Sequence, residues 1–181
     1  FDQLMQTWLL SPLGMRQASF VQPIPEAHRG RTAKGHLADG SPVPGGWNNH
    51  PERAAAGLWT TPSDMATLLI ELYRASKGAS ATLDQELVEE LLAEPVDGHA
   101  YGFRMLGDGD DVFLTHYGGT TGYRAGMSIN LRTGDGAVYL ANSDGGSALG
   151  AEFLNSVSEV YDWTAFKTTI VKRSPKPRPV L

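Results

Sequence analysis

One histidine and the glycines that follow it are the residues best placed to do chemistry. His116 precedes Tyr117, Gly118, Gly119 and Thr120, and strand-like runs flank this segment on both sides. Glycine has no Cβ atom, so a backbone built from it lets a substrate come close. A histidine beside it can hold or move a proton near neutral pH. The segment therefore predicts a hydrolytic site at a small glycine-rich turn between two strands.

Three stretches of the chain carry a family resemblance. His116-Tyr117-Gly118 fits the His-x-Gly variant of a third catalytic motif, and residues 11–15, Ser-Pro-Leu-Gly-Met, resemble a Pro-Leu-Gly-Met turn. Residues 56–66, Ala-Gly-Leu-Trp-Thr-Thr-Pro-Ser-Asp-Met-Ala, resemble the Gly-Leu-x-Ser/Thr-x-x-Asp-x-Ala start of a helix. Their order and spacing are similar to those of the serine β-lactamase and penicillin-binding-protein superfamily. The class C-like branch, with its D-aminopeptidases and esterases, is the most similar, over about residues 1 to 162.

The resemblance implies roles for the residues of the third motif. His116 would be catalytic, donating a hydrogen bond to a substrate carboxylate or carbonyl, or relaying a proton. Gly119 would offer its backbone N–H to the oxyanion hole, where one such donor lowers the barrier by about 3 kcal/mol. Gly118, Thr120 and Tyr117 would contact substrate, although strand alternation points Tyr117 away from the cleft.

Residues 17–60 form a long irregular segment rich in Gly, Pro and His. Loops of this length are uncommon in compact domains and often functional. In the resembled superfamily this region lines one side of the substrate cleft, which makes Trp47 and Asn48 candidate substrate-binding residues. A plain surface loop is an equally open interpretation.

Two motifs of the superfamily, Ser-x-x-Lys and Tyr-x-Asn, are absent. No serine has a lysine three residues on, as the nucleophile motif Ser-x-x-Lys requires, and no tyrosine has an asparagine two residues on. We expect both motifs to precede Phe1. The chain is therefore interpreted as the C-terminal half of a serine hydrolase that acts through an acyl-enzyme on β-lactam, D-peptide or ester carbonyls, and that is inactive alone. Two alternatives are a stand-alone, non-catalytic binding module with a relic cleft, and one chain of a two-chain hydrolase.

The composition of the chain argues against several other classes of function. The 181 residues carry a net charge of −5, which argues against a nucleic-acid surface. Cysteine is absent, which excludes disulfides and thiolate chemistry. No apolar run of about 18 residues occurs, so no membrane span is expected. No histidine has a metal-ligand spacing, so neither a metal nor a cofactor is expected. The compartment stays open.

The order of helix-like and strand-like segments predicts an α+β fold, the C-terminal part of a β-lactamase/DD-peptidase-like domain. Four strand-like runs separated by Gly/Asp turns predict an antiparallel meander covered by helices. The expected helices are residues 1–10, 62–78, 83–94 and 147–161, and the expected strands are 101–106, 112–116, 123–131 and 137–142. The last helix is expected to bury Leu149, Phe153, Leu154, Val157 and Val160, and the first to carry Phe1, Leu4, Met5 and Trp8 on one apolar face.

The chain is expected to divide into a domain of residues 1–171 and a tail of residues 172–181. The tail is basic and its prolines alternate, which favours an extended chain. It is either a solvated tail or an arm that grips an acidic partner. The predicted partners are a small-molecule or peptide carbonyl substrate, and either the N-terminal half of the same domain or a second copy of this chain to complete the sheet.

Overall fold

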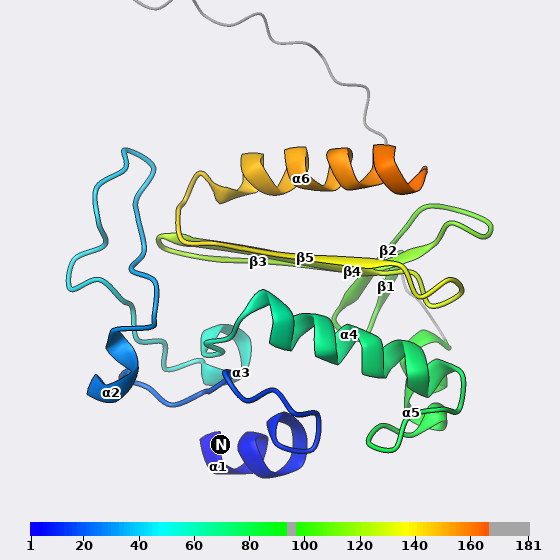
Figure 1. The fold of residues 1–181 in the computed structure, drawn as a ribbon, viewed down its shortest axis with the longest axis horizontal. Helices are drawn as coiled ribbons and strands as arrows, with labels where there is room; N and C mark the ends of the chain where they lie inside the picture. The colour runs from blue at the N-terminus through cyan, green and yellow to red at the C-terminus, as the bar shows by residue number, and fades with distance from the viewer. Residues whose placement is uncertain (94–96, 167–181) are drawn as a thin grey trace, which may run out of the picture.

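A computed structural model describes residues 1–93 and 97–166. A sheet forms the middle layer, with α6 on one face and α4 and α5 on the other (Figure 1). The helices are α1 Asp2–Met5, α2 Glu26–Arg29, α3 Arg53–Ala56, α4 Pro62–Ser76, α5 Gln85–Leu92 and α6 Gly146–Tyr161, with a π-helix, η1, at Gln6–Leu10. The strands are β1 His99–Ala100, β2 Phe103–Leu106, β3 Phe113–Thr120, β4 Tyr123–Ile129 and β5 Gly136–Ala141. The predicted tail lies outside the described residues.

The predicted α+β class and antiparallel meander are confirmed. The strands pair in the order β1-β2-β3-β4-β5, each antiparallel to the next. Local signals set α4 as expected: the Thr61 hydroxyl accepts from the Asp64 N–H at 3.2 Å, and Pro62 occupies the first turn. Gly78 follows the helix with a left-handed φ of 65°. In the described residues no helix combines the length and apolarity needed to cross a bilayer.

The β3–β4 turn is not where the sequence placed it. β3 was expected to end at His116 and to be followed by a turn at Gly118 and Gly119, but the strand continues to Thr120. The two turn residues are Thr121 and Gly122, and Gly122 has a φ of 82°, which glycine adopts without strain. Glycine content alone therefore misplaced the turn, because only one of the three glycines needs a left-handed backbone.

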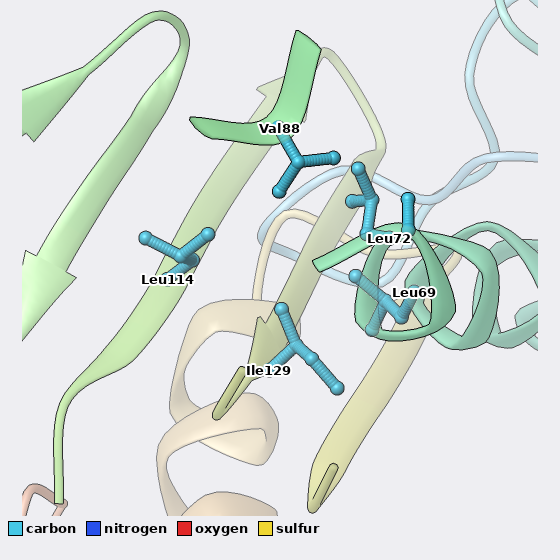
Figure 2. Packing of buried hydrophobic residues seen from close by; sticks show 6 residues of the cluster. Leu69, Leu72, Val88, Leu114 and Ile129 are labelled. Carbon is cyan, nitrogen blue, oxygen red and sulfur yellow. The ribbon is translucent and has the colours of Figure 1, made fainter. Parts of the chain in front are cut away.

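Alternation along the strands gives the sheet two different faces. On the α4 face, Leu114 and Ile129 pack against Leu69 and Leu72 of α4 and Val88 of α5 (Figure 2). On the α6 face, Phe113 contacts Leu154, Trp163 and Phe166 at one end of the sheet. Toward the other end this face carries Gly119, Arg124 and Gly126 beside the rings of Tyr117 and Tyr139.

Part of the expected burial on α6 is wrong. Leu154 is buried, but Leu149 and Val160 are 64% and 77% exposed. The stripe that faces the sheet runs through Gly146, Gly150, Leu154 and Ser158. Gly150 lies so close to Tyr139 that an added Cβ would stand 2.1 Å from the ring. Small residues thus let α6 approach the sheet, and they turn its apolar stripe partly toward solvent.

The N-terminal helix also differs from its expected face. Phe1, Leu4 and Trp8 are exposed, whereas Leu10 is buried. The chain passes from α-helix to π-helix at Gln6, and the wider i→i+5 turn shifts the face on which Trp8 and Leu10 lie relative to Phe1 and Leu4. The helical spacing of the sequence therefore predicted the element but not its buried side.

Candidate active site

The C-terminal half of β3 is paired on one side only. β2 pairs with β3 solely through Phe113, Leu114 and Thr115. From His116 to Thr120, β3 pairs only with β4 in the part of the chain that the structure describes. The burial of β3 changes at the same point, from three buried residues to exposed ones. This stretch, His116–Thr120, is called the free edge of β3.

The pairing pattern fixes which backbone groups point out of the free edge. Because only two residues connect the strands, Thr120 and Tyr123 are the hydrogen-bonded pair that closes the hairpin. Hydrogen-bonded and non-hydrogen-bonded pairs alternate along an antiparallel ladder. Gly119 and Arg124 therefore form a non-hydrogen-bonded pair. The N–H and C=O of Gly119 point away from β4, into the space beside the free edge.

Two cavities, of about 930 and about 460 Å³, meet at the free edge. The larger extends between β3 and β4 and the first half of α6, and Tyr117, Tyr139 and Ser147 line it. The smaller lies between the long N-terminal loop and the sheet, with Trp59 and Tyr123 in its wall. The residues common to both cavities are His50, Gly118, Gly119, Thr120, Arg124 and Ala125.

His116 is exposed and lies at the start of the free edge, but it lines neither cavity. Its Nδ1 lies 2.5 Å from the carbonyl oxygen of Gly102, in the turn between β1 and β2. A carbonyl only accepts, so Nδ1 carries the proton. In the neutral imidazole Nε2 is then left as a proton acceptor. The histidine is thus fixed in the tautomer that suits a proton relay.

Tyr117 and Gly119 lie on the α6 face of the sheet, whereas His116 and Gly118 lie on the α4 face. Both Tyr117 and Tyr139 pack over Gly126, where an added Cβ would stand 2.9 and 2.3 Å from their rings. Burial raises the pKa of the Tyr117 phenol, and burial together with the neighbouring Tyr117 raises the pKa of Tyr139. Both phenols are therefore neutral hydrogen-bonding groups in the larger cavity.

The two predicted loop residues have different positions. The Asn48 side-chain amide donates to the Thr121 carbonyl at 2.8 Å, and Asn48 lines the smaller cavity. Trp47 lines neither cavity, and its buried Nε1 has no hydrogen-bond partner among the described residues. The Lys34 ammonium lies 5.7 Å from the Trp47 ring centroid. The structure thus brings Asn48, Gly118, Gly119 and Thr120 together and leaves Trp47 apart.

A beta-lactamase family model matches residues 1–155 of the chain. The chain belongs to the beta-lactamase family. A comparison with curated proteins gave no match.

Several solved structures share the fold at low identity. A penicillin-binding protein homologue from Pyrococcus abyssi has a TM-score of 0.69 at 19% identity, over 92% of this chain and 39% of its own. A beta-lactamase/D-alanine carboxypeptidase from Pseudomonas syringae has a TM-score of 0.64 at 15% identity, over 79% and 48%. A D-amino acid amidase from Ochrobactrum anthropi SV3 has a TM-score of 0.62 at 22% identity, over 88% and 54%. The chain thus spans about 39% to 54% of the length of these relatives.

His50 lies in the same loop as Trp47 and Asn48, and the structure places it at the cleft. It lines both cavities beside the free edge. Its backbone N–H donates to the side-chain oxygen of Gln22 at 2.6 Å, and the Gln22 amide donates to the Gly57 carbonyl at 3.2 Å. Because Gln22 is buried, it ties the loop that carries His50 to the body of the domain. Only this long-range contact, and no local pattern, places the imidazole at the cleft.

One further stretch matches a superfamily spacing by chance. Ser128-Ile129-Asn130 has the Ser-x-Asn form of the second motif. However, Ser128 is fully buried within β4, and the Asn130 side chain accepts from the N–H groups of Arg132 and Thr133 in the following turn. These residues are structural. Among the described residues no group of three or more His, Cys, Asp or Glu side chains could hold a metal ion.

Proposed function

We propose that this chain forms the C-terminal half of a serine hydrolase that acts through an acyl-enzyme on β-lactam, D-peptide or ester carbonyls. The observation that carries the proposal is the free edge of β3, where the Gly119 N–H points outward at the meeting point of two cavities. The nucleophile comes from a Ser-x-x-Lys segment upstream, together with a Tyr-x-Asn segment. Family membership over residues 1–155 supports this assignment.

In the proposed reaction the serine oxygen bonds to the substrate carbonyl carbon, and the carbonyl electrons move onto oxygen. The Gly119 N–H donates to this developing oxyanion. When the tetrahedral species collapses, the bond to the leaving nitrogen or oxygen breaks, and the leaving group takes a proton. Water then attacks the acyl-enzyme in the same way and releases the acid. The upstream lysine and tyrosine move the protons to and from the serine.

The remaining cleft residues bind and orient the substrate. Gly118 leaves open space on the α4 face of the free edge, since no atom of the described residues lies within 4 Å of where its Cβ would be, and the outward backbone groups of this edge are unpaired. An extended substrate can therefore lie along β3. His116 supplies Nε2 at the start of this edge, where it contacts a substrate carboxylate when protonated and relays a proton when neutral. His50 and Thr120, which line both cavities, contact the substrate beside this edge.

We also propose that an N-terminal half or a second copy of this chain completes the sheet along β5. In the described residues no strand pairs with the outer edge of β5. Leu149, Val160 and Tyr161 of α6 are more than half exposed. Unpaired edges and exposed apolar side chains favour association. Light scattering after size-exclusion chromatography tests this, and a well-dispersed monomer that ignores an added N-terminal half would count against it.

The catalytic proposal is tested by acyl trapping. This chain and a longer protein carrying an upstream Ser-x-x-Lys are incubated with a chromogenic β-lactam, a D-amino-acid anilide and a p-nitrophenyl ester. Mass spectrometry should find an acyl group only on the upstream serine of the longer protein. Turnover traced to a serine of residues 1–181 would overturn the proposal. Substrate binding without acylation would favour a non-catalytic module, and acylation on a separate polypeptide would favour a two-chain enzyme.

A further inference from the structure

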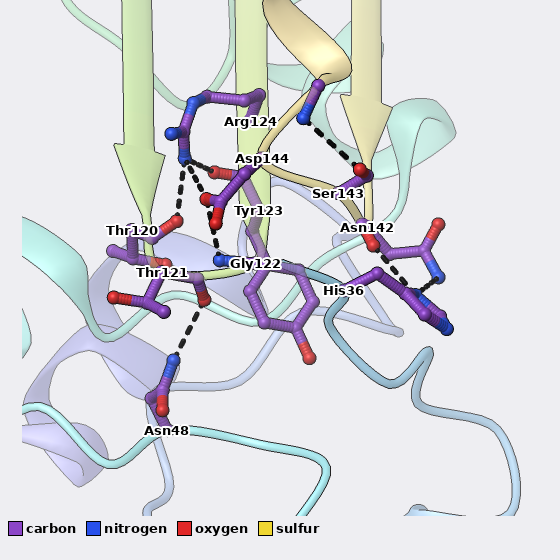
Figure 3. A network of polar contacts seen from close by, with 11 residues as sticks. His36, Asn48, Thr120, Thr121, Gly122, Tyr123, Arg124, Asn142, Ser143 and Asp144 are labelled. Carbon is purple, nitrogen blue, oxygen red and sulfur yellow. Dashed lines mark hydrogen bonds and ion pairs between the residues drawn. The ribbon is translucent and has the colours of Figure 1, made fainter. Parts of the chain in front are cut away.

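The ion pair between Arg124 and Asp144 is hydrogen-bonded to the turn that ends the free edge of β3 (Figure 3). Arg124 Nη1 lies 3.0 Å from Asp144 Oδ1, and the same nitrogen donates to the carbonyls of Thr120 at 2.8 Å and Tyr123 at 2.6 Å. Asp144 Oδ1 also accepts from the Gly122 N–H at 2.9 Å. The carbonyl side and the N–H side of the turn are thus held by the two members of one charged pair.

The pair joins the turn to the beginning of α6. Asp144 lies just before α6, and the backbone at Gly146 is packed so closely that an added Cβ would stand 3.0 Å from the Arg124 Cβ. The side chains of Arg124 and Asp144 are only 28% and 20% exposed. Ion pairs that are partly withdrawn from water interact more strongly than exposed pairs. The end of β3 is therefore held by a tertiary contact to the start of α6 as well as by its own turn.

Arg124 also covers Gly119 directly. The two residues are opposite each other in the β3–β4 register. A Cβ at Gly119 would lie 3.0 Å from Arg124 Cδ and 3.2 Å from Nη1. The arginine therefore lies against the α6 face of this glycine, while the glycine N–H stays in the plane of the sheet and points to the free edge. The side chain restrains the backbone without occupying the oxyanion position.

We propose that Arg124, held by Asp144, is a positioning residue that fixes the Gly119 N–H for oxyanion stabilisation. This inference rests on the proposed function. β2 does not support β3 beyond Thr115, so the free edge has only β4 and the turn to hold it. A donor stabilises a transition state only if it is held in place before charge develops. The Arg124–Asp144 ion pair, which is hydrogen-bonded to the turn, supplies this restraint from the α6 face of the sheet.

The first experiment measures steady-state kinetics of the complete enzyme with Arg124→Ala, Arg124→Lys and Asp144→Asn. A misplaced donor lowers kcat by on the order of tenfold to a hundredfold, and KM should stay within about threefold because substrate binding elsewhere is intact. Arg124→Lys should recover part of the kcat. Arg132→Ala is the matched control, because Arg132 pairs with Asp110 at 3.5 Å at the opposite end of β4. An unchanged kcat, or a change in KM alone, would overturn the proposal.

The second experiment uses this chain alone and needs no activity. Amide hydrogen exchange by NMR should accelerate at Thr120, Gly122 and Tyr123, whose N–H groups are hydrogen-bonded at the turn, in Arg124→Ala, and should stay unchanged at Phe113–Thr115. If Arg124→Ala disrupts the whole fold, Asp144→Asn makes the same local measurement, because it removes the charge and keeps the shape. Unchanged exchange at all three of these amides would overturn the positioning role. If the wild-type enzyme forms no acyl-enzyme, the proposed function fails, and the exchange data still decide whether Arg124 orders this strand end.

Discussion

The two halves of β3 have opposite environments within eight residues. Phe113–Thr115 is buried and paired with both β2 and β4. His116–Thr120 is mostly exposed and, among the described residues, pairs only with β4. Its last three residues line both cavities, and Tyr117 lines the larger one. The first half contributes to stability because apolar side chains lose contact with water there. The second half leaves backbone groups unpaired, which costs stability but gives a substrate somewhere to bind.

The comparison shows how one strand can serve both purposes. A strand end without a neighbour frays unless other contacts hold it. Here the long N-terminal loop helps to hold it, because the Asn48 side-chain amide donates to the Thr121 carbonyl at 2.8 Å (Figure 3). The Tyr123 hydroxyl also donates to the Ala33 carbonyl at 2.9 Å. The rigid half anchors the strand, and the loop and α6 fix the half that stays open.

The largest expected effect on stability comes from the buried half. Phe113→Ala should lower the free energy of unfolding by about 3 to 5 kcal/mol, because a fully buried ring is lost next to Trp163 and Phe166. Urea unfolding of the chain, followed by tryptophan fluorescence, measures this. A loss below about 1 kcal/mol would mean that the two halves do not differ in stability as described.

In the open half the large effect should fall on activity. His116→Ala in the complete enzyme should cost about 2 to 4 kcal/mol of transition-state stabilisation. The free energy of unfolding should change by only about 1 kcal/mol, since one exposed hydrogen bond to Gly102 is lost. Stopped-flow acylation measures the loss of transition-state stabilisation, and urea unfolding of the same variant measures the loss of folding stability. A wild-type kcat/KM would remove His116 from the site.

Two glycines of the hairpin give a matched pair of substitutions. Gly126→Ala should destabilise by about 1 to 3 kcal/mol, because the new Cβ would stand 2.3 Å from the Tyr139 ring. Gly118→Ala should change the free energy of unfolding by about 0.5 kcal/mol or less, because no atom of the residues that the structure describes lies within 4 Å of its Cβ position. Thermal and urea unfolding compare them. Equal destabilisation by both would show that the free edge is more tightly packed than described.

The smallest expected effect concerns alkaline pH. Burial raises the pKa of the Tyr117 phenol in the folded state above its unfolded value of about 10. The unfolded chain then loses the proton first, so the free energy of unfolding should be highest below pH 10 and fall as pH rises from there. Tyr117→Phe should reduce that fall, and Tyr161→Phe, on the outer side of α6, is the control. Urea unfolding at pH 9 and pH 11 measures it, and identical falls in both variants would contradict the assignment.

The sequence alone determined the elements whose signals are local. The Thr61 cap and Pro62 located the start of α4, and Gly/Asp turns separated the strands of an antiparallel meander. The His116-Tyr117-Gly118 motif, with its flanking stretches, identified the family. These predictions succeeded because capping, turn formation and alternation depend on residues a few positions apart. Even so, the glycines placed the β3–β4 turn too early, because glycine permits a turn without requiring one.

Only the tertiary structure decided which parts of those elements are open. β2 stops pairing at Thr115, which creates the free edge and turns the Gly119 N–H outward. The burial of Gly150 rather than Leu149 follows from how closely α6 approaches Tyr139. His50 reaches the cleft through Gln22, more than twenty residues away in sequence. Such features depend on which distant segments meet, and no local pattern encodes a contact whose partner lies elsewhere in the chain.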